Sequence, residues 1–531
     1  MRLRTPKALA VAAALLFLAA GGCTDTTVEP KSTLTEANVF DDPASYQMLI
    51  AKVYAGLAVT GQRGQYGAGD ITHPDEGFTQ YVRLLWEFEQ LPTDEVLISW
   101  GGDAGLLELN SGVWGSSNAF LQAMYYRIFF QVMMANEFLR QTTDAKLDER
   151  GNVSSSLRAQ IATWRAEARF LRALSYWHGI DLFGSIPLVT ENDPLGATPP
   201  QQATRADIYN FIVSELTTII PELPAPGAST YGRATGTAGS MLLAKLYMNA
   251  EVYTGAPNYG GVLTALAPVL AGPYTLAPVY RNNFRADNHT SPEIIFAVTQ
   301  DGQRTQAYGA VTFLIHASCG GPMVDSDYGI SGCWWGIRLK PQGYNLYLPP
   351  FEVAGDTRSS YFVDNGSGSA VTNMFNFTDG IAAPKYINKT ATGASGSDAT
   401  FVDTDYPMFR LADAYLMYAE AVVRGGGGTR AQALAYINAL RQRAYGNTSG
   451  DITDPEMTLQ FILDERGREL LWEGHRRTDL VRYGLFTGGT YIWAWKGNVL
   501  AGQSTSAHLN LYPLPANELV ANPNLTQNPG Y

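Results

Sequence analysis

Apolar side chains recur at helical spacing in several long segments of this chain, and no other feature constrains its fold as strongly. They are separated by three, four or seven positions in 157–182, 408–422 and 433–444. A stripe with this period is the buried face of an amphipathic helix. The chain is therefore predicted to be mostly α-helical, with further helices expected near 44–58, 118–140, 205–219, 236–253 and 457–475.

The predicted helices fall into two blocks, at about 36–253 and 405–475. In the second block, four consecutive glycines at 425–428 separate two helices and permit a tight reversal of the chain. A helix, turn, helix unit of about 34 residues has the scale of a tetratricopeptide repeat. Internal similarity is too weak to establish repeats, but the pattern indicates a scaffold of packed helix pairs.

The region between the blocks, about 255–404, has a different composition. It is rich in Gly, Pro, Asn, Ser and aromatic residues, and it contains a strand-like run at 293–298. Long irregular insertions on a rigid scaffold commonly carry binding function. We therefore expect the ligand site in this region. Residues 476–531 are expected to form a C-terminal tail.

The N-terminus has the pattern of a secretory signal peptide. Arg2, Arg4 and Lys7 precede an apolar run at 8–20. That run is too short to cross a bilayer as a mature helix. Residues 1–22 are therefore interpreted as a signal peptide.

The end of the apolar run resembles a bacterial lipobox. Gly21 and Gly22 precede Cys23, although Ala20 stands where a larger aliphatic residue is usual. This predicts a lipidated Cys23 that begins a flexible tether at 23–35, so that the lipid is the sole membrane anchor. Ordinary secretion with an incidental cysteine is the alternative.

Charge and motif content argue against several functional classes. The formal net charge is −12 with no block of like charges, which disfavours nucleic-acid binding. The six histidines are scattered, and no paired Cys/His spacing indicates a metal site. No nucleophile elbow or P-loop motif is present. No catalytic residue, metal or cofactor is predicted. A calcium ion held by Asp and Asn residues of loops is the open alternative, although no EF-hand pattern is present.

Charged residues also align on two of the predicted helices, and two interpretations are open. Either they form a charged ligand site or acid/base pair, or they hold helices together in a network of ion pairs. The second is favoured, because nothing distinguishes these carboxylates from ordinary helix-face charges. Glu473 can also pair with Arg476 or Arg477, which lie three and four residues further on. The residues are Arg165, Arg169, Arg172, Glu465, Glu469 and Glu473.

Six segments, in order along the chain, together resemble the SusD/RagB family. They are Thr93-Asp94-Glu95 with Trp100-Gly101-Gly102-Asp103, RAEARFLRALSYWHGIDLFGSIP at 165–187, Arg233-Ala234-Thr235, YPMFRLADAYLMYAE at 406–420, ERGRELLWEGHRRTDLVRYG at 465–484 and LYPLPANELVANPNLTQNPGY at 511–531.

This resemblance implies that 36–531 form one SusD-like domain with four tetratricopeptide-like helix pairs and a large irregular region presenting the ligand site. It also implies a non-enzymatic outer-membrane lipoprotein facing the cell exterior. Such proteins capture oligosaccharides and pass them to a SusC-like, TonB-dependent transporter that they cover as a lid. Polypeptide ligands also occur in the family, so a peptide-binding role is an alternative.

The most informative loop, 316–338, contains two cysteines. If Cys23 is acylated, Cys319 and Cys333 remain, and a pair outside the reducing cytosol favours a disulfide. Two buried free thiols are the alternative. A disulfide would clamp the loop and reduce the cost of ordering it on binding.

Aromatic residues of this loop are candidates for stacking on sugar rings. By resemblance, family members that bind starch-like sugars build an aromatic arc from two places, and Trp100 with Asp103 occupies the first. Tyr328 with Trp334 or Trp335 occupies the second. Asp327 and Arg338 are candidates for bonding sugar hydroxyls. Alternatively, Trp334 and Trp335 are core residues, although adjacent residues in an extended loop point opposite ways.

Two other functional classes compete with glycan capture. A surface glycoside hydrolase would need two carboxylates roughly 5–10 Å apart around the scissile bond. No pair of carboxylates in the sequence indicates this. A repeat scaffold that binds proteins on its helical face explains the helices but not the aromatic loop.

Overall fold

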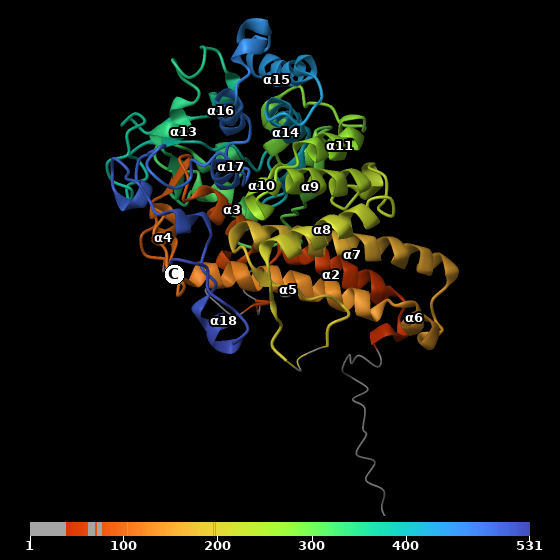
Figure 1. Cartoon of the computed structure of the whole chain (residues 1–531). Helices are drawn as coiled ribbons and strands as arrows, with labels where there is room; N and C mark the ends of the chain where they lie inside the picture. The colour runs from red at the N-terminus through yellow and green to blue at the C-terminus, as the bar shows by residue number, and fades with distance from the viewer. Residues whose placement is uncertain (1–38, 62–68, 72–76, 104, 195, 197) are drawn as a thin grey trace, which may run out of the picture.

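The computed structural model describes residues 39–61, 69–71, 77–103, 105–194, 196 and 198–531 (Figure 1). The predicted signal peptide, Cys23 and the tether lie outside these residues. In the part of the chain that is described, no helix is both long enough and apolar enough to span a membrane.

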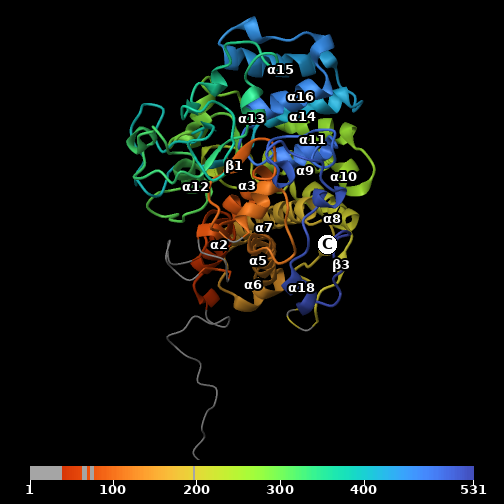
Figure 2. The same cartoon turned by 90° about the vertical axis from the view of Figure 1, so that its left-hand side faces the viewer.

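Nine long helices among the described residues pack on one another in a continuous stack (Figures 1 and 2). Each helix packs on the next in the series α5, α7, α8, α9, α11 and α14. In addition, α14 packs on α15 and α16, and α2 packs on α5 and α7. This confirms the mostly α-helical fold. The nine are α2 (Ala44–Ala58), α5 (Ala119–Gln141), α7 (Ser155–Leu182), α8 (Arg205–Ile219), α9 (Gly236–Met248), α11 (Tyr259–Leu270), α14 (Leu411–Val423), α15 (Arg430–Tyr445) and α16 (Leu459–Glu469).

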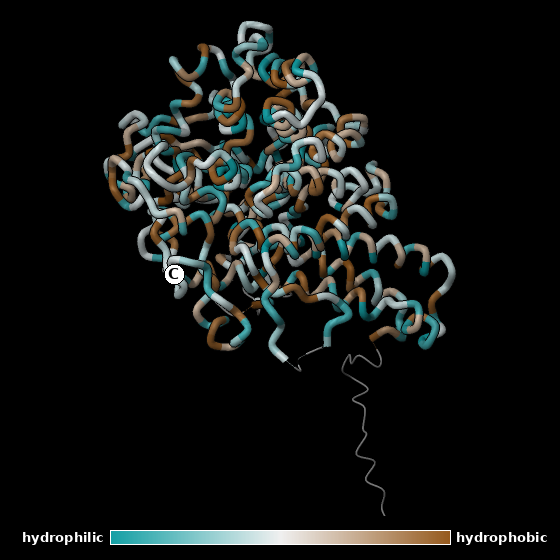
Figure 3. The backbone as a smooth tube through the Cα atoms, viewed as in Figure 1, coloured by the Kyte–Doolittle hydropathy of each residue, from teal (hydrophilic) through white to brown (hydrophobic). Residues whose placement is uncertain are grey.

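Side-chain caps fix where several of these helices begin. Ser154 accepts a hydrogen bond from the third residue of α7, and Thr204 and Thr458 do the same for α8 and α16. Such caps satisfy backbone N–H groups that have no partner within the helix. Apolar and polar residues alternate along the helical tube in Figure 3, as expected when each helix buries one face.

Short helices connect and cover the stack. They are α3 (Tyr81–Gln90), α4 (Leu106–Ser111), α6 (Asp144–Arg150), α10 (Ala250–Thr254), α12 (Ala310–Ala317), α13 (Pro341–Asn345), α17 (Arg476–Arg482) and α18 (Ala516–Ala521). Every residue of α3 is buried, and α3 contacts α2, α5, α12 and α17. It therefore joins the helical stack to the irregular region.

Three small antiparallel sheets complete the fold. One has the strand order β1-β5-β7-β6, and the other two are the pairs β2-β3 and β4-β8. The strands are β1 (Val96–Ile98), β2 (Ile186–Pro187), β3 (Gln202–Ala203), β4 (Ile294–Val298), β5 (Ile337–Leu339), β6 (Val363–Asp364), β7 (Ile381–Ala382) and β8 (Tyr406–Arg410).

Four sequence expectations need correction. Met408 lies in β8, because pairing with β4 holds 406–410 extended, and the helix begins at Leu411. The segment 236–253 divides into α9 and α10 at Asn249. The expected loop-rich region contains α11, which packs on α9 and α14 and so belongs to the helical stack. The helix expected to reach residue 475 ends at Glu469.

The aligned glutamates lie in a buried network of ion pairs. Arg410 bonds Glu293, Glu469 and Glu473, and Arg358 bonds Glu465 and Glu469. Burial raises the pKa of Glu469, but the surrounding arginines outweigh it and lower the value to about 2. These carboxylates join β8, α16 and the irregular region, which confirms the structural interpretation.

The partner expected for Glu473 was wrong. Arg476 bonds Asp94 and Arg477 bonds Asp181, whereas Glu473 bonds Arg410. Because α16 ends before Glu473, the three- and four-residue spacing no longer places these side chains on one helix face.

The arginines of α7 are also structural. Arg169 and Arg172 both bond Glu215 of α8. Arg165 donates to the Leu139 carbonyl of α5 and to Thr142. They therefore fix α7 against its two neighbouring helices.

Candidate functional site

Strand pairing brings together two segments that lie far apart in the sequence. Ile98 of β1 lies opposite Ile337 of β5 in an antiparallel pair. In this arrangement, the residues that follow one strand lie beside those that precede the other. Trp100, just after β1, therefore meets Trp334, just before β5.

The two indoles contact each other directly. The Nε1 of Trp100 donates a hydrogen bond to the Trp334 carbonyl oxygen at 3.0 Å, and the ring centroids are 6.4 Å apart. The edge of Phe313, on α12, packs against Trp100 at 5.9 Å. Both tryptophans are half-buried, so the protein holds part of each ring and leaves part accessible.

Two further rings surround Trp334. It stacks on His316, with centroids 4.5 Å apart and planes at 23°, and it lies 6.1 Å from Tyr308. Tyr308 is also half-buried. We call Trp100, Tyr308 and Trp334 the aromatic site.

His316 packs against Trp334, and backbone carbonyl groups hold its ring in place. Its two ring nitrogens lie 2.7 Å from the Gly332 carbonyl oxygen and 2.9 Å from that of Thr400. Burial lowers the pKa of His316, although both carbonyls act in the opposite direction. The ring is held at both nitrogens and gives Trp334 a fixed, flat surface to stack on.

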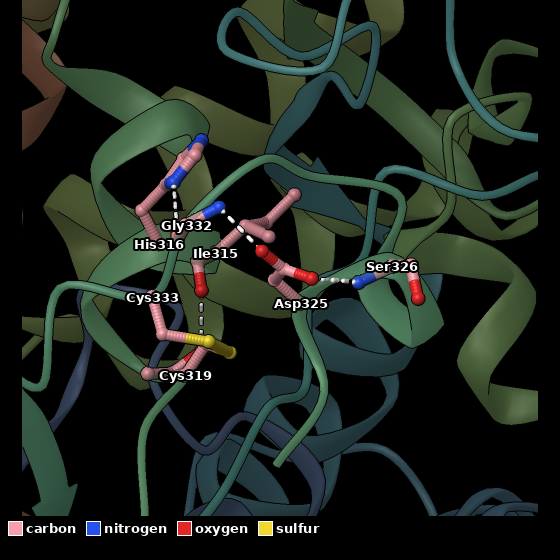
Figure 4. The surroundings of a disulfide bond; sticks show 8 residues. Ile315, His316, Cys319, Asp325, Ser326, Gly332 and Cys333 are labelled. Carbon is pink, nitrogen blue, oxygen red and sulfur yellow. Dashed lines mark hydrogen bonds between the residues drawn. A yellow bond between two sulfur atoms is a disulfide. The ribbon is translucent and has the colours of Figure 1, made fainter.

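A disulfide between Cys319 and Cys333 closes the loop that carries Trp334 (Figure 4). The two Cα atoms are 4.7 Å apart. Inside the loop, one carboxylate oxygen of Asp325 accepts from Gly332 N at 2.8 Å and the other accepts from Ser326 N at 2.7 Å. The loop is thus fastened at both ends and across its middle.

Polar groups border the aromatic site. Asp103, half-buried, follows Trp100 along the chain. Arg83 of α3 lies over the Phe313 ring at 4.3 Å, and its Nη1 donates to the Tyr308 carbonyl at 3.2 Å. Burial raises the pKa of its partner Glu87 to about 7, and the charge of Asp103 contributes to this increase.

Trp335 faces a different neighbour from Trp334. It is 47% exposed and packs beside Phe377, with centroids 5.8 Å apart. Its backbone N–H donates to the Cys319 carbonyl at 2.9 Å. Of the two adjacent tryptophans, only Trp334 therefore stacks within the aromatic site.

Tyr328 lies on another part of the loop. It belongs to a 3-10 turn, η7 (Asp325–Tyr328), and its carbonyl accepts from Asn388 N at 2.8 Å. Burial raises the pKa of its hydroxyl, with Arg281 acting in the opposite direction. The neighbouring Asp327 is exposed. Both side chains remain candidates for ligand contact at the edge of the loop.

Arg338 does not fit its expected role. It is fully buried on β5, where its guanidinium donates to the carbonyl oxygens of Asp379, Asn373 and Met374. Burial lowers its pKa to about 10. The prediction that Arg338 bonds a ligand is wrong for this structure, because β5 directs the side chain into the protein.

Sequence reasoning did not identify Tyr308 or Phe375. Tyr308 precedes α12 in a segment that carries no recognisable motif. Phe375 is 52% exposed, and its ring lies where a Cβ on Gly101 would come within 2.6 Å of it. Gly101 has no Cβ, so it lets the Phe375 ring approach the backbone closely, and a glycine at this position is the sequence signal for such a contact.

The site has the chemistry of a binding surface for apolar faces and hydroxyl groups. Half-exposed rings offer flat apolar surfaces, and the half-buried carboxylate of Asp103 can accept hydrogen bonds. Among the described residues, no cluster of three or more His, Cys, Asp or Glu side chains is arranged to hold a metal ion.

Known proteins place this fold and chemistry in context. A model of the SusD family matches residues 351–531. The starch-binding protein SusD of Bacteroides thetaiotaomicron is 33% identical, over 98% of this chain and 98% of its own length. This chain belongs to the SusD family. A more distant SusD-like relative, protein P2 of Formosa agariphila, is 24% identical over 97% of this chain and 98% of its own.

Solved structures of SusD-like proteins share the fold. A SusD homolog of Bacteroides thetaiotaomicron has a TM-score of 0.72 at 18% identity, covering 94% of this chain and 99% of its own. Surface glycan-binding protein A of the same species, solved with laminarihexaose, has a TM-score of 0.69 at 20% identity. That match covers 91% of this chain and 98% of its own.

Proposed function

We propose that this SusD-family chain captures neutral oligosaccharides, with starch-type α-glucans the first candidate, at the aromatic site. The observation that carries this proposal is the meeting of Trp100 and Trp334, each half-buried and fixed by a hydrogen bond between them. Asp103, half-buried and three positions after Trp100, is a candidate for bonding hydroxyl groups. The starch-binding name of the relative at 33% identity supports the ligand class.

The affinity follows from the chemistry of the site. Each sugar face that packs on a ring removes apolar area from water, at roughly 25 cal/mol per Å². Each hydroxyl hydrogen bond replaces one to water and contributes only about 0.5–1.5 kcal/mol net. A dissociation constant of about 10 μM to 1 mM is expected, which also permits release.

The proposal extends to where the protein acts. Lipidation at Cys23 and a tether at 23–35 would hold the domain at the outer membrane, facing the exterior. Delivery would then be to a TonB-dependent, SusC-like transporter that the domain covers as a lid. The lipobox-like sequence and membership of the family support this part.

The mechanism is equilibrium binding without bond cleavage. The buried carboxylates described above are engaged by arginines, as Glu469 is by Arg410 and Arg443, and so hold the fold together. A hydrolase would instead place two carboxylates on either side of the scissile bond.

A binding panel tests the proposal. The mature protein is titrated with amylose, laminarin, other neutral glycans and unstructured polypeptides, and the glycans are afterwards analysed by chromatography. Saturable binding of amylose with no change in chain length is expected. Binding of polypeptides alone, or shortening of the glycan, would contradict the proposal.

A further inference from the structure

A hollow lies near the aromatic site, on the other side of the loop 397–405. It is an open groove of about 640 Å³ bordered mainly by polar side chains. The loops of the irregular region that form it gather around α12, on the left in Figure 2. Its lining includes Tyr231, His289, Gln300, Gln303, Arg304 and Asp403.

The floor of the groove is built around Asp405, which is 3% exposed. One carboxylate oxygen accepts from the Tyr231 hydroxyl at 2.7 Å, and the other accepts from Gln300 N at 2.7 Å. The edge of His289 faces the Tyr231 ring at 6.4 Å. The rings of Tyr231 and His289 therefore lie at the groove, and both carboxylate oxygens of Asp405 already accept hydrogen bonds from the protein.

The wall of the groove is the loop 397–405, and it is fixed before any ligand arrives. The carboxylate of Asp403 accepts from Gly302 N at 2.8 Å and from Ser397 N at 2.6 Å. The Nε2 of Gln303 donates to the Ser397 carbonyl at 3.0 Å. A preformed wall lowers the entropy cost of binding.

The other side of the same loop touches the aromatic site. Phe401 packs on Tyr308 with centroids 5.2 Å apart, and the Thr400 carbonyl lies 2.9 Å from His316 Nε2. The loop 397–405 therefore lies between the aromatic site and the groove. A ligand that occupies the aromatic site and extends past this loop would enter the groove.

The side chains facing the groove suit a neutral, hydroxyl-rich ligand. Gln303 and His289 can donate and accept hydrogen bonds. Arg304 is largely exposed and is paired with the partly exposed Asp301 at 3.5 Å. The acidic residues of the lining outnumber its single arginine, which disfavours anionic sugars. Burial raises the pKa of Asp405 to about 6.

We infer that the groove is a second sugar-binding position, which holds further residues of a neutral glycan chain anchored at the aromatic site. This inference rests on the proposed function and adds to it. It predicts that the protein favours polysaccharide over short oligosaccharides, because a longer chain reaches both positions.

The test compares a long and a short α-glucan. Amylose and maltotriose are titrated into the mature wild-type protein and into a His289→Ala/Arg304→Ala variant. Both side chains are exposed, so the variant should keep the fold, which thermal unfolding checks. Arg430→Ala removes an exposed arginine of α15 and is the matched control.

The expected result is a three- to ten-fold weaker affinity of the double variant for amylose, with maltotriose affinity unchanged within twofold. Equal affinity of variant and wild type for amylose would overturn the inference. An equal loss for both ligands would also overturn it, because the change would then act through the aromatic site. If the wild type binds neither glucan, the proposed function fails, and the inference fails with it.

Discussion

The indole nitrogen of Trp100 donates a hydrogen bond to the backbone carbonyl of Trp334 at 3.0 Å, across 234 positions of sequence. The pairing of β1 with β5 makes this contact possible, since it aligns the residues that follow Ile98 with those that precede Ile337. The two rings are thus held by the sheet and by each other. A ligand that packs on them meets a surface that needs little rearrangement.

Replacing each adjacent tryptophan separately should give different results. Trp334→Ala removes the ring stacked on His316, so glucan affinity should fall at least tenfold. Trp335→Ala removes a ring beside Phe377, and a loss of less than threefold is expected. Isothermal titration with amylose measures both. Equal losses in the two variants would show that the aromatic site is wrongly assigned.

Removing the disulfide should weaken both the fold and the site. A Cys319→Ser/Cys333→Ser variant frees a loop with a sequence separation of 14. A loop of this length corresponds to about 3 kcal/mol in the free energy of unfolding. Glucan affinity should fall two- to five-fold, because the loop must then be ordered on binding. Denaturant unfolding and titration report the two effects, and unchanged values for both would argue against the clamp.

The buried ion pairs predict a large effect from a change that preserves size. Glu469→Gln removes the charge that faces Arg358, Arg410 and Arg443. Removing one partner from a buried ion pair costs up to about 3–5 kcal/mol. Each of the three arginines keeps another carboxylate partner, so a loss toward the lower end of this range is expected. Urea unfolding should detect this loss, whereas Glu222→Gln, at an exposed position, should change stability by less than about 0.5 kcal/mol. Similar stabilities of the two variants would contradict a structural role for the network.

Histidine burial predicts a pH dependence of stability. Burial lowers the pKa of His178 to about 3, and its Nδ1 lies 2.8 Å from the Tyr81 hydroxyl. Between about pH 6.5 and 3, the unfolded chain binds a proton here that the folded chain does not. Its contribution to stability is therefore complete above pH 6.5 and decreases as the pH falls, by about 1.4 kcal/mol per unit.

Unfolding measured from pH 7 to pH 4.5 in wild type and His178→Gln checks this dependence. The variant should lose less stability over that interval, by about 3 kcal/mol, because it lacks the titrating ring. Parallel pH profiles would show that His178 does not contribute. The variant retains the other buried groups, so the difference isolates this residue.

The helices were predictable where the apolar spacing is regular. The segments 44–58 and 205–219 match α2 and α8 to the residue, since apolar spacing is local information. Met408 was misassigned because its spacing from Leu411 fits a helix, whereas pairing with β4 makes its segment a strand. Strand partners lie far away in the sequence, and local periodicity does not reveal them.

The site was only partly predictable for the same reason. Trp100 and Trp334 were selected from separate segments, and the structure brings them together, although ligand contact by either remains a prediction. Arg338 was selected because it follows them, but β5 turns it inward. Tyr308 reaches the site only through the packing of α12 against α3, which a single sequence does not encode in any motif.

A crystal structure of the mature protein soaked with maltoheptaose tests the central claim most directly. The account predicts an intact glucan whose sugar faces lie within about 4 Å of the Trp100 and Trp334 rings, at van der Waals contact. A glucan bound only elsewhere on the protein, or one cleaved into shorter products, would contradict it.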